Sequence, residues 1–249
     1  MPPPAERGFV APVEYDIALL TGCLADLGYS FEYIPQTTST MDSATIKGTN
    51  PTVILTNHQT QGRGRVGRTW YDQAGMSLLM TVAEPFSDIE GDPSPSSFLS
   101  PQLFTLAACL ALQEVAETNH IQIKYPNDLV LVDETGNRVG KLGGILVENP
   151  DHNPRGSYPK LFGIGINVYY KSAQETFPKT EYGAVSLSEV VETKALDRNI
   201  IILTIMKKWA KIRSDLRRIS DPTLFDEYDK LWRKNYMLTG KTVVFKDTQ

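Results

Sequence analysis

Apolar residues recur along this chain with the two spacings that distinguish helices from strands. Between residues 13 and 27 they fall three or four positions apart, at Val13, Ile17, Leu20, Leu24 and Leu27. This spacing predicts an amphipathic helix, and Gly28 is a typical residue to end it. Further helices are predicted at 101–117, which is mostly apolar, and at 200–217 and 223–234, which have charged outer faces.

Short runs rich in β-branched residues predict the strands. They lie at 31–34, 52–56, 76–82, 121–124, 129–132, 144–148, 161–168 and 241–245. Polar segments rich in turn-forming residues predict loops at 88–97, 133–137 and 149–159. Because strands and helices do not alternate regularly, we expect an α+β fold with a mixed or antiparallel sheet flanked by helices.

Composition narrows the class of protein. A length of 249 residues predicts one large domain, alone or with a small appendage. A net charge of −4 argues against general nucleic-acid binding. Cys23 and Cys109 both lie in apolar helical patterns, which argues against a disulfide framework and favours the cytoplasm. No apolar run reaches membrane-spanning length, and the first residues do not resemble a secretion signal.

Residues 61–70, Gln-Gly-Arg-Gly-Arg-Val-Gly-Arg-Thr-Trp, are the most informative segment. Glycine lets the backbone approach a ligand closely, and the arginine side chain matches carboxylate and phosphate oxygens. On an acidic protein, this local positive charge favours a specific anionic ligand. We therefore expect a mobile loop that closes over a small anionic intermediate.

The same segment allows two other interpretations. Its glycines fit the Gly-x-Gly-x-x-Gly dinucleotide fingerprint, and Glu84 follows about 20 residues later, as that motif requires. The fingerprint needs a helix after the glycines, however, whereas residues 75–82 predict a strand. An arginine-rich surface loop that binds RNA, or that has no ligand, is the other alternative.

Two further segments carry polar groups suited to such a ligand. Ser39, with Asp42 three residues later, predicts a helix start whose free N–H groups can bind a polar ligand, although capping alone would explain the serine. Asn127 and Asp128 end the sequence Lys-Tyr-Pro-Asn-Asp and suit a magnesium-bound nucleotide. A simple turn would have the same composition.

Glycines also interrupt two predicted strands. Lys141 stands just before Gly143 and Gly144, where it could neutralise an acidic ligand, although a lysine before a strand is often merely solvated. Gly163 and Gly165 repeat the pattern, and glycine inside a strand marks a bulge or a close approach. Together these segments predict one flat pocket with a floor of bare backbone.

In order and approximate spacing these segments resemble those of the biotin protein ligases. The resemblance covers residues 30–245 and rests on 39–40, 62–70, 124–128, 141–146 and 163–167. It implies a catalytic domain at 1–236, related to class II aminoacyl-tRNA synthetases, and the first strand of a truncated C-terminal SH3-like domain at 237–249. The N-terminal DNA-binding domain of many bacterial members is expected to be absent, so we expect no DNA partner.

The resemblance implies a two-step reaction. The carboxylate of biotin attacks the α-phosphorus of Mg·ATP, giving biotinyl-5′-adenylate and pyrophosphate. A lysine amine of a biotin carboxyl carrier protein domain, part of a biotin-dependent carboxylase, then attacks the mixed anhydride. A homodimer is left open. No covalent side-chain nucleophile is required, and His58, His120 and His152 form no recognisable triad.

The resemblance also assigns residues to roles, with Arg65 and Lys141 as the catalytic pair. The positions implied for biotin are Ser39, Thr40, Met41, Gln59, Gly62, Arg63, Gly64, Arg65, Trp70, Lys141, Gly144, Gly163 and Gly165. Those implied for ATP are Arg65, Arg68, Trp70, Asn127, Asp128, Lys141 and Asn167, with Asp128 as a magnesium ligand.

The chain departs from the family pattern at Tyr125, where tryptophan is usual, and at Gln61 and Gly143, where alanine is usual. None of these changes removes a charged group. The alternative function is a lipoate or octanoate ligase or transferase on a related scaffold, but its Arg-Arg-x-x-Gly-Gly-Gly element is missing from the sequence. A non-enzymatic nucleic-acid-binding protein is a more distant alternative.

Overall fold

A seven-stranded mixed sheet forms the centre of the molecule, in the order β1-β2-β3-β7-β6-β5-β4. The computed structural model describes residues 12–45, 50–85, 95–149, 159–178, 183–191, 196–216 and 222–242. The strands are β1 (Ser30–Thr37), β2 (Thr52–Gln59), β3 (Ser77–Pro85), β4 (Ile121–Lys124), β5 (Asp128–Val132), β6 (Arg138–Glu148) and β7 (Pro159–Asn167). β1 and β2 pair in parallel, and every other pair is antiparallel, which confirms the predicted mixed sheet.

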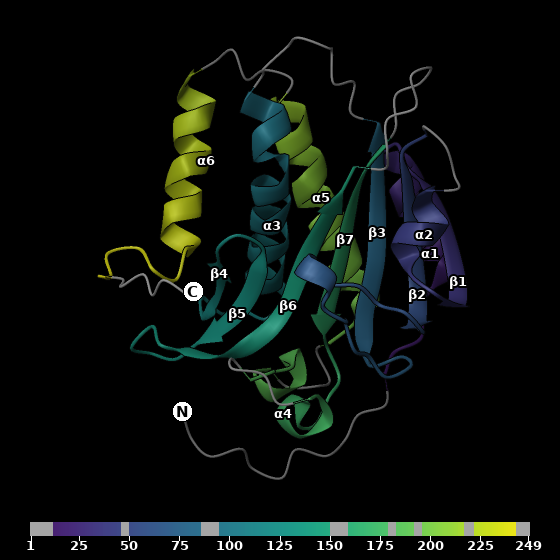
Figure 1. Cartoon of the computed structure of the whole chain (residues 1–249). Helices are drawn as coiled ribbons and strands as arrows, with labels where there is room; N and C mark the ends of the chain where they lie inside the picture. The colour runs from purple at the N-terminus through teal and green to yellow at the C-terminus, as the bar shows by residue number, and fades with distance from the viewer. Residues whose placement is uncertain are drawn as a thin grey trace.

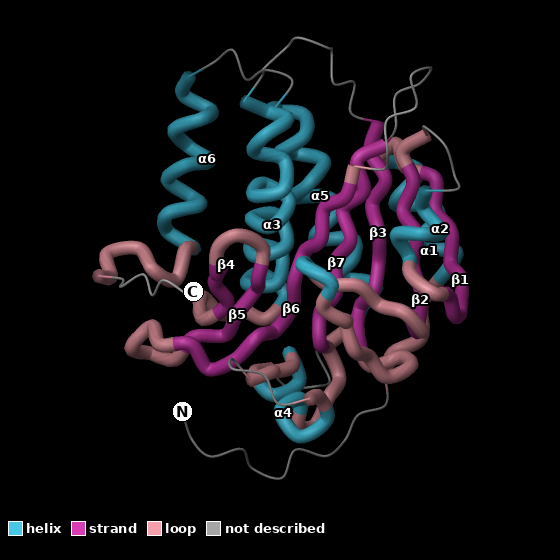
Figure 2. The backbone as a smooth tube through the Cα atoms, viewed as in Figure 1, coloured by secondary structure: helices cyan, strands magenta, loops and turns pink. Residues whose placement is uncertain are grey.

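Helices cover the sheet unequally on its two faces (Figure 1). They are α1 (Ile17–Asp26), α2 (Thr40–Thr45), α3 (Pro95–Val115), α4 (Ala173–Thr176), α5 (Arg198–Leu216) and α6 (Pro222–Asn235), with short 3-10 turns η1 (Arg65–Gly67) and η2 (Leu187–Glu189). The large core lies between the sheet and α1, α3 and α5. A small cluster under α2 lies on the opposite face. Most of that second face is therefore left for the segment between β2 and β3, which crosses it in Figure 2.

The N-terminal helix is shorter than its apolar spacing predicts. It begins at Ile17, because the Asp16 side chain caps it by accepting from Leu19 N at 2.9 Å. The preceding backbone is bonded to α5 instead, where Arg198 donates to the carbonyl of Val13. Val13 and Ile17 are consequently exposed, so the buried face of the helix is made by Leu20 and Leu24 and not by the whole predicted apolar series. The predicted end is confirmed, since Gly28 has a φ of +85°.

Other element boundaries also shift. α3 begins at Pro95 and not at 101, so Pro101 lies within the helix; of the predicted loop at 88–97, residues 88–94 lie outside the described residues. β6 begins at Arg138, so Lys141 lies inside a strand and not before one. Most of the loop at 149–159 and of the strand at 241–245 also lies outside the described residues. Among the helices that are described, none combines the length and apolar character of a membrane span.

A buried carboxylate joins the sheet to α5. Glu84 in β3 is 2% exposed and accepts hydrogen bonds from Tyr29, from Trp209 Nε1 at 2.8 Å and from Arg213. Burial, followed by the neighbouring carboxylate, raises the pKa of Tyr29, so its hydroxyl stays protonated and donates. Glu84 is thus a structural residue, and this placement excludes the ribose-binding role that the dinucleotide fingerprint would require.

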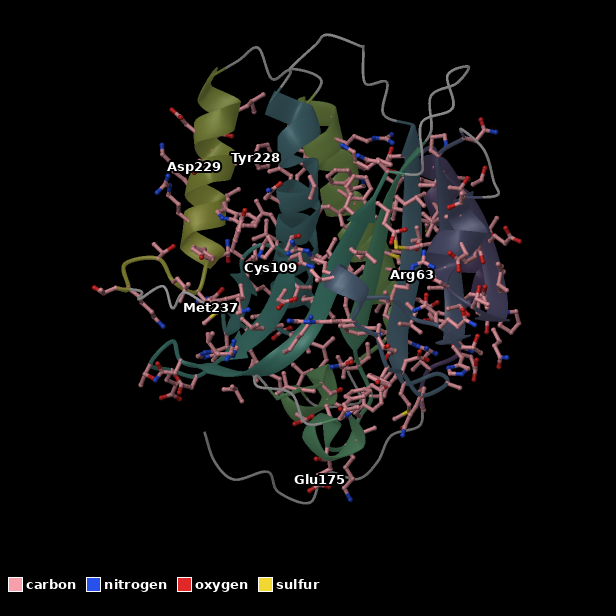
Figure 3. The ribbon with its side chains drawn as sticks, in the orientation of Figure 1. Arg63, Cys109, Glu175, Tyr228, Asp229 and Met237 are labelled. Atoms are coloured by element: carbon pink, nitrogen blue, oxygen red, sulfur yellow. The ribbon has the colours of Figure 1, made fainter. Side chains whose placement is uncertain are left out.

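We expect Glu84→Gln to destabilise the fold by about 3 kcal/mol, because it leaves Arg213 without its buried counter-charge. Urea unfolding should show a lower midpoint at an unchanged slope. Asp229→Asn is the matched control, because it breaks an exposed ion pair with Arg233 on the α6 surface (Figure 3) and should cost no more than about 0.5 kcal/mol. Equal midpoints for the two variants would contradict the structural role of Glu84.

Candidate functional site

A cavity of about 410 Å³ lies between the second face of the sheet and the segment that joins β2 to β3. All but one of the residues predicted for ligand binding line it. They are Ser39, Thr40, Met41, Gln59, Arg63, Gly64, Arg65, Arg68, Trp70, Asn127, Asp128, Lys141, Gly144, Gly163, Gly165 and Asn167. Residues from five separate parts of the sequence are therefore brought to one place.

The arginine-rich segment folds as a narrow hairpin. Arg63 pairs with Thr69 in an antiparallel bridge, and Gly64 N donates to the carbonyl of Arg68 at 2.7 Å. At the tip, Val66 has a φ of +55° and Gly67 a φ of +69°, and the Arg68 N–H closes the turn onto Arg65 O. Two successive residues with positive φ are typical of a type I′ hairpin turn, which suits glycine and strains valine.

Gly62 is the predicted site residue that does not line the cavity. A Cβ at this position would lie 2.5 Å from the carbonyl oxygen of Trp70. Trp70 N in turn donates to Gly62 O at 2.9 Å. The glycine is therefore needed for the two arms of the hairpin to approach each other.

Two arginines of the hairpin hold it against the rest of the site. Arg63, labelled in Figure 3, contacts Asp42 of α2 at 2.6 Å and Glu148 of β6 at 3.3 Å. Arg65 donates to Asn127 Oδ1 at 3.1 Å. Both ion pairs of Arg63 are substantially exposed, and such pairs contribute only about 0.2–1 kcal/mol each. Arg65 and Arg68 are exposed at the cavity, available to an anion.

The floor of the cavity is bare backbone of β7, as predicted. A Cβ at Gly163 would lie 2.8 Å from the sulfur of Met41, and one at Gly165 would lie 2.6 Å from Cε2 of Trp70. The indole of Trp70 thus rests directly on the strand. Its Nε1 is buried and has no hydrogen-bond partner among the described residues.

Lys141 reaches the cavity from β6. Its Nζ lies 2.7 Å from Asp128 Oδ1 and 5.8 Å from the ring centroid of Trp70. Lys124 also approaches Asp128, at 3.8 Å. The two ammonium groups outnumber the single carboxylate here, so this wall of the cavity carries net positive charge.

The magnesium role predicted for Asp128 stays a prediction. Its carboxylate is paired with two lysines, and magnesium at nucleotide sites is usually held by one or two carboxylates together with the phosphates of the substrate. We therefore treat magnesium only as part of the Mg·ATP substrate.

Polar groups close the opposite end of the cavity. Gln59 Oε1 accepts from Thr40 N at 2.8 Å and from Thr40 Oγ1 at 3.1 Å, and Thr81 donates to the same threonine at 2.8 Å. Ser39 caps α2 by accepting from Met41 N at 3.3 Å. In a complete capping box the Asp42 side chain would accept from the backbone N–H of Ser39. That contact is not among those described, because Asp42 accepts from Thr38 and Arg63 instead.

Two predicted nucleotide residues make well-defined contacts. Asn127, whose Oδ1 is held by Arg65, donates through Nδ2 to the carbonyl of Ile145. Asn167 is buried and donates to the carbonyl of Val185 at 3.1 Å. Their amide groups are thereby fixed at the edge of the cavity.

Several lining residues were missed from the sequence. Leu146, Ile145 and Ile164 add apolar surface, and the segment after β7 contributes Phe177, Pro178, Gly183 and Ala184. Gly183 and Ala184 reach the site because their backbone pairs with Lys141. No local motif marks them, since their position depends on this long-range pairing.

The site offers no activated thiol. Cys109 is fully buried, and burial raises the pKa of its thiol to about 12. Both cysteines are free. The arrangement is suited to holding and neutralising anions, which fits a reaction between two bound substrates better than covalent catalysis by a side chain.

Comparisons with known proteins agree with this geometry. Among curated relatives, the bifunctional ligase/repressor BirA of Bacillus subtilis is 33% identical over 162 residues, which is 62% of this chain and 43% of the relative. The biotin–(acetyl-CoA-carboxylase) ligase of Mycobacterium tuberculosis is 30% identical over 178 residues, 71% of this chain and 59% of that protein. The chain thus matches about half the length of these relatives.

Solved structures show the same fold. Biotin protein ligase from Leishmania major in complex with biotin superposes with a TM-score of 0.64 at 21% identity, covering 88% of this chain and 86% of that one. The Aquifex aeolicus enzyme in complex with biotin and ATP gives 0.62 at 22% identity, covering 83% and 78%. The model of the biotin/lipoate A/B protein ligase family matches residues 31–173, more than half of the chain. The chain belongs to the biotin/lipoate A/B protein ligase family.

Proposed function

We propose that this chain is the catalytic region of a biotin protein ligase, which activates biotin with Mg·ATP and transfers it to a lysine of another protein. The single observation that carries the proposal is the arginine hairpin folded over a glycine-floored cavity that also receives Lys141. Several of its relatives are named as biotin ligases, which supports biotin as the acid. The division into a catalytic domain at 1–236 and the start of an SH3-like domain at 237–249 is part of the same proposal.

Adenylation brings a carboxylate and a triphosphate together, and both are anions. Arg65 and Lys141 both line the cavity, Arg65 from the hairpin and Lys141 from β6. We assign them to the carboxylate of biotin and the α-phosphate, where fixed cations stabilise the charge that builds up as the carboxylate oxygen attacks phosphorus. Pyrophosphate leaves, and no side chain needs to form a bond.

The biotin and ATP ends follow from the polarity of the cavity. Ser39, Thr40 and Gln59 offer a cluster of hydroxyl and amide groups, which suits the ureido ring of biotin, and the backbone near Arg63 and Gly64 completes this end. The apolar remainder of biotin would then lie beside Met41 and Trp70, whose side chains pack on Gly163 and Gly165. For ATP we propose Arg68, Asn127, Asp128 and Asn167, at the end of the cavity that is rich in lysine.

Transfer requires that the adenylate be kept from water until the acceptor amine arrives. We propose a biotin carboxyl carrier protein domain of a biotin-dependent carboxylase as the acceptor, in line with the name of the relative from Mycobacterium tuberculosis. We also propose a cytoplasmic location, which is consistent with two free cysteines.

Lipoate is the alternative acid, because the family as described includes lipoate ligases. Thermal-shift measurements with biotin, lipoate and an oligonucleotide test all three candidate ligands on one plate. Biotin with Mg·ATP should stabilise the protein, by about 2.7 kcal/mol at a ligand concentration 100 times the Kd. If only lipoate stabilised the protein, a lipoate ligase would replace the proposed function. If only the oligonucleotide did, a nucleic-acid-binding protein would replace it.

We expect Lys141→Ala to slow biotin-dependent pyrophosphate release by at least tenfold while the fold stays intact. The variant removes a charge-assisted contact with an anion, which typically costs about 1.5–3 kcal/mol. Lys208→Ala, which removes a surface ion pair with Glu114, is the matched control and should keep the wild-type rate. A wild-type rate for Lys141→Ala would remove this lysine from the catalytic assignment.

The hairpin should be mobile without ligand and ordered by biotin with Mg·ATP, because its ion pairs to Asp42 and Glu148 are exposed and weak. Limited trypsin digestion measures this directly at Arg63, Arg65 and Arg68. We expect cleavage to slow strongly once the ligands are added. The same cleavage rate with and without ligands would argue against closure.

Arg65→Gly should release the reactive intermediate. Its guanidinium lies at the hairpin, opposite Asn127, where it can hold the adenylate oxygens. Its loss should weaken retention by about ten- to a hundredfold, at 1.4 kcal/mol per factor of ten. The measurement is biotin labelling of serum albumin added as a bystander, with Arg233→Ala as a control far from the cavity. A uniform loss of activity without bystander labelling would show that Arg65 does not retain the adenylate.

A further inference from the structure

The two ends of the hairpin segment are joined by a histidine and an aspartate that no part of the proposed reaction uses. His58, near the end of β2, places Nδ1 2.8 Å from Asp72 Oδ2. Gln59 N approaches the other oxygen of Asp72 at 3.4 Å. Asp72 thus holds two successive residues of β2 from the far end of the segment.

This pair differs from the other contacts of the hairpin in its burial. The side chain of Asp72 is 0% exposed, and that of His58 is 31% exposed. The two ion pairs of Arg63, in contrast, join side chains that are all between 38% and 46% exposed. Exposed pairs exchange readily with solvent, whereas a buried carboxylate that lost its donors would be left unsatisfied. The neck of the hairpin, where His58 contacts Asp72, should therefore stay closed when the tip at Val66 and Gly67 opens.

The position of the pair connects it to the cavity. Neither His58 nor Asp72 lines the cavity, but each is adjacent in sequence to a residue that does, Gln59 and Tyr71 respectively. Gln59 accepts two hydrogen bonds from Thr40 at the polar end of the cavity. A shift at the neck would therefore displace both Gln59 and the base of the hairpin.

We propose that His58 and Asp72 are a positioning pair that clasps the neck of the arginine hairpin, so that the tip opens and closes as one unit while Gln59 stays in place. The pair acts through Gln59 and the hairpin and does not touch the substrate. Its effect on biotin binding rests on the proposed function, whereas its effect on the hairpin does not.

The chemistry of the pair supports a fixed orientation. The carboxylate can only accept, so His58 Nδ1 carries the proton and Nε2 faces away from the pair. Burial raises the pKa of Asp72, and the hydrogen bond from His58 opposes that rise. The hydrogen bond from the imidazole therefore favours the ionised form of the buried carboxylate and fixes its orientation.

The test compares Asp72→Ala, Asp72→Asn and His58→Ala with the wild type and with His120→Ala, which alters an exposed histidine outside the site. In the ligand-free protein, trypsin cleavage at Arg63, Arg65 and Arg68 is followed by mass spectrometry. Asp72→Ala and His58→Ala should be cut at least roughly tenfold faster, which corresponds to about 1.4 kcal/mol. Asp72→Asn should be intermediate, because its single amide oxygen can keep only one of the two hydrogen bonds, from Nδ1 or from Gln59 N. His120→Ala should match the wild type.

Turnover supplies a second measurement. In the variants, KM for biotin should rise about tenfold, because Gln59 is displaced. The value of kcat should fall by a smaller factor, because Lys141 lies on β6 outside the hairpin and Arg65 is retained. Unchanged cleavage in both Asp72→Ala and His58→Ala overturns the clasp, as does faster cleavage spread evenly over the whole chain with a matching loss of melting temperature. If Asp72→Ala does not fold, His58→Ala decides the outcome. If the wild type itself shows no biotin-dependent turnover, the proposed function fails, but the cleavage rates still test the clasp.

Discussion

A side chain at position 165 could not coexist with the indole of Trp70, because its Cβ would lie 2.6 Å from Cε2 of the ring. A side chain is also excluded at Gly143 on the neighbouring strand β6, where a Cβ would lie 2.7 Å from the carbonyl oxygen of Gly165. Close packing at these backbones lets the hairpin lie flat on the sheet and sets the depth of the cavity. The cationic groups come within reach of one ligand only because this floor has no side chains.

Charge is distributed to suit that floor. The chain as a whole is acidic, yet Arg63, Arg65, Arg68, Lys124 and Lys141 all line one cavity. Acidic partners restrain three of them, since Asp42 holds Arg63 and Asp128 contacts both Lys141 and Lys124. An anionic ligand would exchange these pairs for its own oxygens, so the ligand-free protein keeps its cations in position without leaving them all unpaired.

Much of the fold and the site could be predicted from the sequence, for reasons that are local. Short runs rich in β-branched residues identified the segments of the sheet, and glycines within strands identified the floor at Gly163 and Gly165. The helix start at residue 13 was wrong because Arg198 and Asn199, far along the chain, hold the backbone of residues 13–16 extended. The cavity wall at 177–184 could not be predicted either, because it depends on backbone pairing with Lys141.

The valine at the tip of the hairpin has a consequence of its own. Val66 is 92% exposed and has a φ of +55°, so a β-branched residue is held in a conformation that costs roughly 1–2 kcal/mol, with no packing to offset it. A hairpin in which Val66 returned to negative φ would recover that energy. The folded segment therefore carries a built-in bias toward rearrangement, set by one exposed residue that lines the cavity. Asparagine or glycine at this position would tolerate the positive φ and remove the bias. The folded hairpin would then be the preferred conformation of the loop.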